Sequence, residues 1–368
     1  MRRSSSRNLK KILARVPVKD LTRFVSAKVG GRCSKTRGLS DSTGPHAPTR
    51  IVSFRKWNTR PCLLSYSSSG KPEVIVEEIS LNIGDEHDLL NANPIGQCHG
   101  LFCLDLDEDD AFGVWNPSLR ELRRIEIEGL NDYGEMGFGY DHSSQDYKIV
   151  FVLETQGSDS KALVLSLKSG VSRMIDFPRL ENVVMSHMRE PGTLVGENIY
   201  WQVYGDGGKA TETFLRFDLV SDTFSYCKGP SNCGEDVLPH ITAGLRGGGL
   251  CTVQVSPCGD IIVWSAQHEK DKIGGGGIKS WSKICSLSRA VLERAVSRGI
   301  DYICLRSAVA YAGLLLLLVS IEGKEAKLLA YNFEDKSLTC VETNLPIDSC
   351  GDLQTYVETL VPIPNASC

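Results

Sequence analysis

A unit of about 50 residues repeats along this chain, and the repeat constrains the fold more than any other feature of the sequence. Each copy has an apolar or aromatic strand, a polar turn and a second strand, as in "VWNPSLRELRRI" at 114–125. A fixed period of roughly 20 to 50 residues is typical of proteins built from stacked structural repeats. Six copies begin at Leu64, Val114, Val164, Arg216, Val263 and Ala330. We expect them to form equivalent hairpins, none of which pairs with another.

A further apolar run precedes five of these hairpins, for example "GLFCLDL" from Gly100 and "LLLLLV" from Leu314. Three to four short strands per unit at this period are typical of a kelch-like propeller blade. Because one four-stranded sheet buries too little core to stand alone, the blades should pack face to face around an axis. The predicted fold is an all-β, six-bladed antiparallel kelch-like β-propeller from about residue 50 onward. The alternative is an array of β-sandwiches.

Helical spacing of apolar residues is limited to two segments, "KILARVPVKDLTRF" at 11–24 and "LSRAVLERAV" at 287–296. The longest apolar run, Gly313–Ile321, is shorter than the roughly 20 residues that a membrane helix needs, so it predicts a buried strand. No apolar block precedes a cleavage site near the N-terminus, which predicts a protein of a reducing compartment that does not bind membranes. The thirteen cysteines include no C-x-x-C pair, so most should be free core thiols.

Charge divides the chain into two parts. Residues 1–37 contain 12 Lys and Arg and the single acid Asp20, whereas the remainder has 29 basic and 44 acidic residues, a net charge of −15. Binding to nucleic acid depends on neutralising phosphates with a basic surface. The acidic body therefore argues against nucleic acid as a partner.

The candidate chemical motifs each fail at a defining position. "DLDEDD" at 105–110 lacks the glycine and the distal glutamate of a calcium loop and predicts an exposed hairpin tip. "GGGGIKS" at 274–280 has Ile278 where a phosphate loop has glycine, so it predicts a flexible loop. In "CHGLFC", Cys98 and Cys103 would point to opposite faces of one strand, which argues against a shared metal.

No nucleophile, acid–base or metal constellation remains, so we expect a protein without catalytic residues, metal or cofactor. Four tryptophans recur at what the pattern suggests are similar blade positions, and we interpret them as packing residues. They are Trp115, Trp201, Trp264 and Trp281.

A series of landmarks resembles the plant F-box-associated interaction domain, in that family's order, across residues 96–363. They are "GQCHGLFCL", "VWNPSLRELRRI", "MGFGYDHSSQDYKIV", "GENIYWQV", "LRFDLVSDTFSY", "KSWSKICSL" and "YVETLVPI". The resemblance implies a substrate-recognition propeller in an F-box protein, the receptor subunit of a cullin-type (SCF) ubiquitin ligase. The implied partners are a Skp-type adaptor, a cullin and a protein substrate that the sequence does not name.

The segment 9–28 resembles the middle of an F-box. Pro17 separates two short helices, because proline is tolerated at a helix start and breaks a helix interior. The resemblance implies adaptor contacts by Leu13, Pro17, Val18, Leu21 and Phe24. We therefore divide the chain into a partial F-box at 1–40, basic and partly disordered, and an F-box-associated propeller at 50–365.

The F-box resemblance ends early on both sides. "MRRSSSRN" replaces the usual opening, and a Gly- and Ser-rich stretch follows Phe24 where the family has a Cys-Lys-x-Trp segment. The pattern predicts that adaptor and cullin binding is weakened or lost. Two other interpretations stay open for this Arg- and Ser-rich segment: an organelle transit peptide and a solvated basic tail.

The predicted protein is a non-enzymatic substrate adaptor in the cytoplasm or nucleus, or in an organelle if the basic N-terminus is a targeting signal. Two alternatives for the function remain. One is a propeller binding protein without ligase coupling, and the other is a propeller enzyme.

Overall fold

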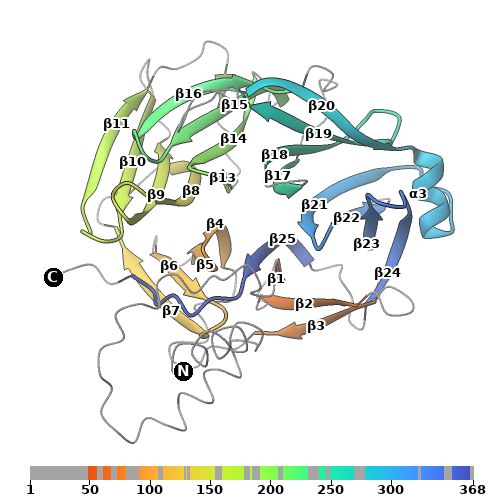
Figure 1. Cartoon of the computed structure of the whole chain (residues 1–368), viewed down its shortest axis with the longest axis horizontal. Coiled ribbons are helices and arrows are strands. Elements are labelled where there is room, and N and C mark those ends of the chain that lie inside the picture. The colour runs from red at the N-terminus through yellow and green to blue at the C-terminus, as the bar shows by residue number, and fades with distance from the viewer. Residues whose placement is uncertain are drawn as a thin grey trace, which may run out of the picture.

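The computed structural model shows a ring of β-sheets around a central axis (Figure 1). It describes residues 49–55, 61–67, 73–79, 89, 92–106, 111–127, 130, 133–153, 160–177, 183–184, 191–205, 210–230, 240–245, 249–268, 278–321, 325–343 and 350–364. Within these ranges no helix is both long and apolar enough to cross a membrane.

The described strands form six blades, which we letter A to F in the order in which the chain first enters them. Neighbouring strands within a blade are antiparallel, and two short strands, β12 and β13, both pair with β14 on the axial side of blade D. From axis to rim, blade A contains β25 (Cys350–Val357), β1 (Thr49–Arg55), β2 (Cys62–Ser67) and β3 (Glu73–Glu78), and blade B contains β4 (Asn93–Cys98), β5 (Leu101–Asp105), β6 (Ala111–Asn116) and β7 (Glu121–Glu126). Blade C contains β8 (Tyr133–Asp141), β9 (Asp146–Leu153), β10 (Ser160–Ser166) and β11 (Ser172–Phe177), and blade D contains β12 (Val183–Val184) with β13 (Thr193–Val195), β14 (Asn198–Gly205), β15 (Ala210–Asp218) and β16 (Thr223–Lys228). Blade E contains β17 (His240–Leu245), β18 (Gly249–Val255), β19 (Ile261–His268) and β20 (Ile278–Leu287), and blade F contains β21 (Ile303–Tyr311), β22 (Leu314–Ile321), β23 (Glu325–Asn332) and β24 (Leu338–Thr343).

The predicted all-β propeller is confirmed, and each of the six predicted hairpins is the outer strand pair of one blade. One expectation is wrong: β24 and β3 pair in parallel, through Glu342 with Glu73 and Thr343 with Val74. Both strands lie at the rim of adjacent blades, and an open strand edge is a ready template for pairing. This short contact joins blades F and A into one eight-stranded sheet.

In four of the blades, a polar side chain at the end of the third strand from the axis begins the turn of the outer hairpin. In blade B, the Oδ1 atom of Asn116 accepts a hydrogen bond from the Ser118 N–H at 2.9 Å, and Arg120 then adopts a left-handed φ of 56°. Asn and Asp favour such turns because their side chains substitute for a backbone acceptor. The same pair of positions recurs in three other blades, as Ser166 with Gly170, Asp218 with Asp222, and Asn332 with Lys336.

The hydrophobic core lies between adjacent blades. Blades A and B share a cluster of aromatic rings in which Phe54, Phe102 and Trp115 have centroids 5.4–6.1 Å apart. The run predicted as a buried strand is β22, which lies in blade F and is buried from Leu315 onward. Because every blade covers the face of the next, no blade has to hold a core alone.

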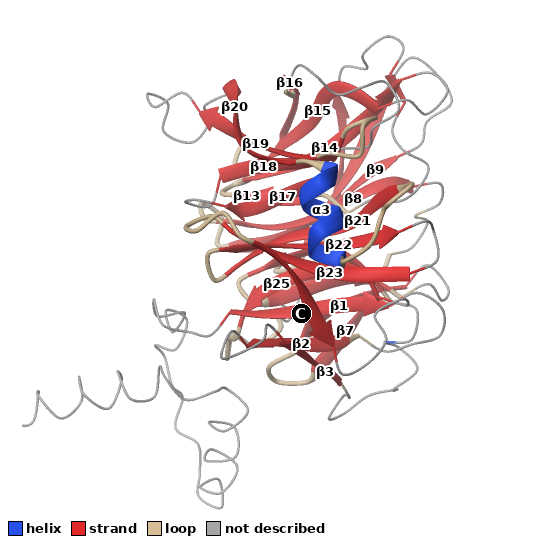
Figure 2. Cartoon of the chain, turned by 90° about the vertical axis from the view of Figure 1, so that its right-hand side faces the viewer, coloured by secondary structure: helices blue, strands red, loops and turns tan. Residues whose placement is uncertain are grey.

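The helix α3 (Arg289–Val296) connects blades E and F on the outside of the ring (Figure 2). It lies in the second predicted helical segment, and its Leu292 is buried in the core between the two blades. The side chain of Ser288 does not cap this helix; instead, the Asp260 carboxylate accepts the N–H of Arg289 at 2.9 Å. The first predicted helical segment, 11–24, lies outside the described residues.

The two ends of the described chain meet in blade A. Strand β25 pairs with β1 from Thr49 opposite Val357 to Arg55 opposite Cys350. The chain then continues past β25 along blade B, where the Asn116 amide donates to the carbonyl of Val361 at 2.9 Å. Figure 1 shows this tail running from β25 past β7. The ring is therefore closed by segments about 300 positions apart.

Candidate functional site

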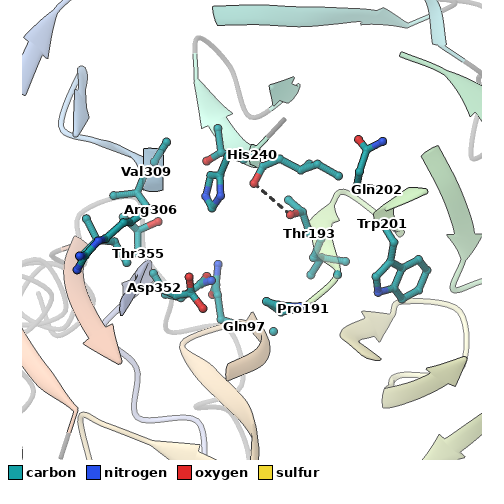
Figure 3. A pocket seen from close by; sticks show the side chains of 18 of the residues that line it. Gln97, Pro191, Thr193, Trp201, Gln202, His240, Arg306, Val309, Asp352 and Thr355 are labelled. Carbon is teal, nitrogen blue, oxygen red and sulfur yellow. Dashed lines mark hydrogen bonds between the residues drawn. The ribbon is translucent and has the colours of Figure 1, made fainter. Parts of the chain in front are cut away.

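The candidate site is a cavity of about 410 Å³ on the axis of the ring (Figure 3). The axial strands β4, β13, β17, β21 and β25 supply most of its walls, together with β14. Ligand pockets in proteins commonly have volumes of about 300–1,000 Å³. The cavity is thus large enough for a small ligand or a short peptide segment.

Hydrogen-bonding side chains dominate the lining that water can reach. They come from separate blades and are half-buried. The set comprises Gln97 of β4, Thr193 of β13, His240 of β17, Arg306 of β21, and Asp352, Gln354 and Thr355 of β25. Because the axial strands converge from every blade, residues distant in the sequence meet here.

His240 and Asp352 interact electrostatically in the cavity. Burial lowers the pKa of His240, while the negative charge of Asp352 and a hydrogen bond with the backbone of Ala308 partly oppose this shift. The imidazole is therefore neutral at pH 7, since its pKa is already below the usual value near 6.5. In Figure 3, His240 lies across the cavity from Asp352 and Gln97.

The remaining polar groups of the wall are oriented by protein contacts. Arg306 donates from Nη2 to the Ser320 hydroxyl of β22 at 3.2 Å, which directs its guanidinium toward the interior of blade F. Thr193 donates to the carbonyl of Ile241 at 3.4 Å and so connects blades D and E. These bonds give the wall a defined shape.

Apolar side chains also contribute to the lining, from more than one side of the cavity, and Trp201 is the largest of them. Its indole Nε1 donates to the carbonyl of Met136 at 2.7 Å, and its side chain is buried between blades C and D. Leu194 and Val309 also line the cavity. The site thus combines an aromatic and aliphatic surface with a few polar groups, as ligand pockets usually do.

The described lining includes no serine or cysteine, and its hydroxyl groups come from Thr193, Thr242, Thr355 and Tyr204. Among all described residues, no three His, Cys, Asp or Glu side chains are grouped to hold a metal ion.

The cysteine motif does not form the single strand that the sequence suggested. His99 and Gly100 form a tight turn with φ of 52° and 80°, so Cys98 ends β4 and Cys103 lies in β5. Both thiols face the core between blades B and C, which corrects the prediction that they point to opposite faces. Burial raises the pKa of Cys98 to about 12 and keeps this thiol protonated. Among the described residues, nine cysteines form no disulfide, and four of these nine are buried.

The tryptophans do not occupy similar blade positions, contrary to prediction. Trp115 and Trp264 lie in third strands, Trp201 in a second strand and Trp281 in a fourth. Trp115 and Trp201 are buried packing residues, as expected, and Trp281 donates to the carbonyl of Lys228 at 2.8 Å. The repeat in the sequence predicts the spacing of the blades, but it does not predict on which strand of a blade a given tryptophan lies.

Three further candidates from the sequence lie partly or wholly outside the described residues. Asp105 is buried at the end of β5, so it is not part of an exposed tip, while 107–110 lie outside the described residues. Of the Gly-rich stretch, Ile278–Ser280 begins β20, and 274–277 lie outside. The five predicted adaptor contacts, Leu13, Pro17, Val18, Leu21 and Phe24, also lie outside the described part.

Sequence reasoning missed His240, Asp352 and the other cavity residues. The repeat was recognised from the outer hairpins and from the apolar second strands, whereas the axial strands mix polar with apolar residues. A signal was present in two polar segments. "HITAGL" lies one strand before the apolar run of β18, and "CGDLQTYV" follows the blade that contains the apolar run of β22. Their meeting on one axis is not visible in the sequence.

Comparison with known proteins agrees with this geometry. The family model of the F-box associated beta propeller domain matches residues 53–363. The chain belongs to this family. Its F-box-associated propeller thus spans the described strands from within β1 to the tail after β25.

Relatives of this F-box-associated propeller occur in Arabidopsis thaliana. An F-box/kelch-repeat protein is 24% identical over 97% of this chain and 94% of its own length. An F-box protein is 23% identical over 67% of this chain and 63% of its own, and the protein SUPPRESSOR OF NIM1 1 is 26% identical over 50% and 53%. Among solved structures, a chain of a nidogen/laminin complex covers 85% of the propeller protein at 10% identity, with a TM-score of 0.47.

Proposed function

We propose that this chain is the substrate-recognition subunit of an SCF-type E3 ubiquitin ligase. The observation that carries the proposal is the family match across residues 53–363, together with an F-box/kelch-repeat relative that aligns over 97% of the chain. The propeller would bind a target protein, and the N-terminal segment would contact a Skp-type adaptor and through it a cullin. Such a receptor needs no catalytic residues, because it acts by raising the effective concentration of its target near the conjugating enzyme.

The roles that we propose for the two parts of the chain follow the domain boundaries predicted from the sequence. Residues 1–40 would be the adaptor-binding part, with Leu13, Pro17, Val18, Leu21 and Phe24 as its apolar contacts, and 50–365 the target-binding part. Affinity purification of the full chain from a plant extract, with the Skp-type adaptor and cullin quantified, tests this function. We expect both to be recovered, in amounts reduced by the partial F-box, and the adaptor to fall further after Phe24→Ala. Recovery of targets without adaptor or cullin would contradict the proposal.

A second function is favoured by the partial F-box. The stretch after Phe24 contains Gly30, Gly31 and Gly38 where the F-box family has its Trp-containing segment, and glycine disfavours helix. The chain would then be a propeller binding protein without ligase coupling. The same purification separates the two functions, because targets would be recovered in either case and the adaptor in only one.

A further inference from the structure

The six junctions between neighbouring blades are not equally apolar. Among the described residues, five junctions each bury a cluster of at least eleven apolar side chains. The corresponding cluster between blades D and E, which are neighbours in Figure 1, buries Tyr200, Leu250 and Ala266, with partly buried residues around them. Burial of apolar surface is the main force that holds such faces together. The D–E junction therefore has the weakest apolar contact in the described ring.

Polar side chains occupy much of the interior of the D–E junction. The apolar residues of β18 and β19 face blade F, so the alternating residues Thr252, Gln254 and Trp264 face blade D. The same alternation in β14 and β15 places Gln202 and Arg216 toward blade E. Three of these side chains, Thr252, Gln254 and Gln202, are buried. Two faces that are apolar at other junctions are thus largely polar at this one.

Two of these polar groups have no hydrogen-bond partner among the described residues. They are the hydroxyl of Thr252, whose side chain is fully buried, and the buried indole Nε1 of Trp264. The two residues lie opposite each other on β18 and β19, so they weaken the same part of the interface. A buried polar group without a partner has lost its hydration with no bond in return, and opening of the junction lets water reach it.

Two hydrogen bonds between blades D and E lie at the margins of the junction. Near the axis Thr193 donates to the carbonyl of Ile241 at 3.4 Å, and at the rim Trp281 donates to the carbonyl of Lys228 at 2.8 Å. Other junctions have stronger links: ion pairs join blades C and D, strands β24 and β3 join F and A, and α3 packs into the core between E and F. The D–E junction is therefore held at its edges around a polar interior.

We propose that the ring opens locally at the junction between blades D and E. Each blade would keep its own strand pairing in this motion, because β14–β16 and β17–β20 form separate sheets. Gln202 and Tyr204 of blade D and Thr242 of blade E line the axial cavity beside this junction. The opening would therefore connect the cavity to solvent from the side. Local openings of this kind occur where a structure has few buried apolar contacts.

The chain contains native thiols that report on this opening. Cys227 lies in the D–E junction, and Cys285 and Cys340, which are also partly buried, lie in the E–F junction. Burial raises the pKa of Cys227 to about 12, and the charge of Arg216 only partly opposes this shift. The Cys227 thiol is thus protonated at pH 7 while the junction is closed, and it reacts with a thiol reagent only when the junction opens.

Alkylation of the folded full chain with iodoacetamide, followed by mass spectrometry of each cysteine, tests the proposal. We expect Cys227 to react at least about tenfold faster than Cys285 and Cys340, as a tenfold more favourable opening equilibrium would give. The exposed Cys258 supplies the rate of an unprotected thiol. Thr252→Val retains the shape of the side chain and removes the unpartnered hydroxyl, so it should slow the reaction of Cys227 by about tenfold.

Thr223→Val is the matched control. Thr223 begins the strand that contains Cys227, but it is exposed and its hydroxyl bonds with that of Ser221 at 2.7 Å. This substitution should leave the rate of Cys227 unchanged, and Thr252→Val should leave the rates of the two E–F thiols unchanged. Thermal unfolding of each variant verifies that the ring is intact.

Equal rates for Cys227 and the two E–F thiols would overturn the proposal, and this comparison needs no variant. A Cys227 rate that Thr252→Val leaves unchanged or raises would also overturn it, because the unpartnered hydroxyl would then not weaken the junction. The measurement uses the chain alone, so its result is independent of whether adaptor, cullin or targets are recovered.

Discussion

Blades A and C have the same four-stranded plan, but the chain supplies their strands differently. Blade C is continuous, from β8 to β11 within residues 133–177. Blade A takes β25 from near the C-terminus and β1 to β3 from residues 49–78. The hairpins of blade C join segments that are close in the sequence, whereas blade A is complete only where the two ends of the described chain meet. Loop closure between distant segments costs conformational entropy, so the two blades depend on different interactions.

Those interactions also differ in kind. Blade C is fixed to blade D by an ionic cluster, in which Lys148 lies 2.8 Å from Asp141 and 2.9 Å from Asp222, and Arg173 also pairs with Asp222. Blade A is fixed to blade B by the tail after β25, through the Arg50–Glu358 ion pair at 2.9 Å and the bonds from Asn116. We therefore expect the stability of the ring to depend most strongly on the segments where its two ends meet.

Removal of β25 should have the largest effect. A chain ending at residue 349 lacks the axial strand of blade A, which also forms one cavity wall. We expect loss of cooperative unfolding, a change on the order of the entire 5–15 kcal/mol that stabilises a typical domain. Circular dichroism during heating measures it, with a chain lacking only 365–368 as control. Retention of a sharp transition by the shorter chain would show that blade A does not depend on closure.

The ionic cluster of blade C should give the next largest effect. Lys148→Met leaves the nearly buried Asp141 without its cation, and breaking a buried ion pair typically costs about 3–5 kcal/mol. Urea unfolding measures this loss. Lys161→Met is the matched control, because Lys161 is exposed and 4.0 Å from Asp176, a type of pair worth about 1 kcal/mol or less. Equal effects of both substitutions would contradict a structural role for the cluster.

Acid should weaken the junction between blades C and D. Burial raises the pKa of Asp141, but hydrogen bonds from Lys148 and from the Ser143 and Ser144 hydroxyls outweigh it and hold the pKa well below its ordinary value. A carboxyl with a depressed folded-state pKa contributes stability above its unfolded pKa of about 3.9, and this contribution is lost as the pH falls below that value.

We therefore expect the free energy of unfolding to decline below about pH 4 in the unmodified chain and to decline less in Asp141→Asn. Denaturant titrations at a series of pH values measure the difference. The control is Asp176→Asn, at an exposed carboxyl of the same blade. A pH profile of Asp141→Asn that matches the unmodified chain would exclude Asp141 as the group responsible.

The smallest expected effect distinguishes two asparagines at equivalent turn positions. Asn116 bonds both its own turn and the tail that closes blade A, whereas the side chain of Asn332 accepts a bond from the Glu334 N–H in an exposed turn. We expect Asn116→Ala to cost about 1–3 kcal/mol and Asn332→Ala about 1 kcal/mol or less. Urea unfolding of the two variants side by side measures the difference, and equal losses would show that the tail contact adds nothing.

Period and composition were enough to predict the blades. The alternation of apolar strands with turns that begin at Asn116, Ser166, Asp218 and Asn332 depends on local chemistry, because a side chain that caps its own turn does so in any tertiary context. The same holds for the buried strand β22 and for α3, whose periodicity reflects burial on one face.

Local patterns did not predict where a residue lies across a blade. "CHGLFC" was interpreted as one strand, but a left-handed turn at His99 and Gly100 folds it into a hairpin and places both thiols in one core. Non-glycine residues rarely adopt positive φ, so a turn that begins at histidine gives a weak signal. Trp115, Trp201, Trp264 and Trp281 likewise fall on different strands, because bulky residues are selected by the space between blades and not by the repeat itself.

The sequence by itself thus determined that the chain is a repeat of antiparallel hairpins and that it resembles a propeller family, since strand period, turn chemistry and family landmarks are written in contiguous residues. Only the tertiary structure decided that β25 completes blade A, that β24 reaches β3, and that Asp352, His240 and Gln97 meet on one axis. The physical reason is that these contacts join segments from separate blades. Their formation depends on how the ring closes, which no stretch of sequence specifies alone.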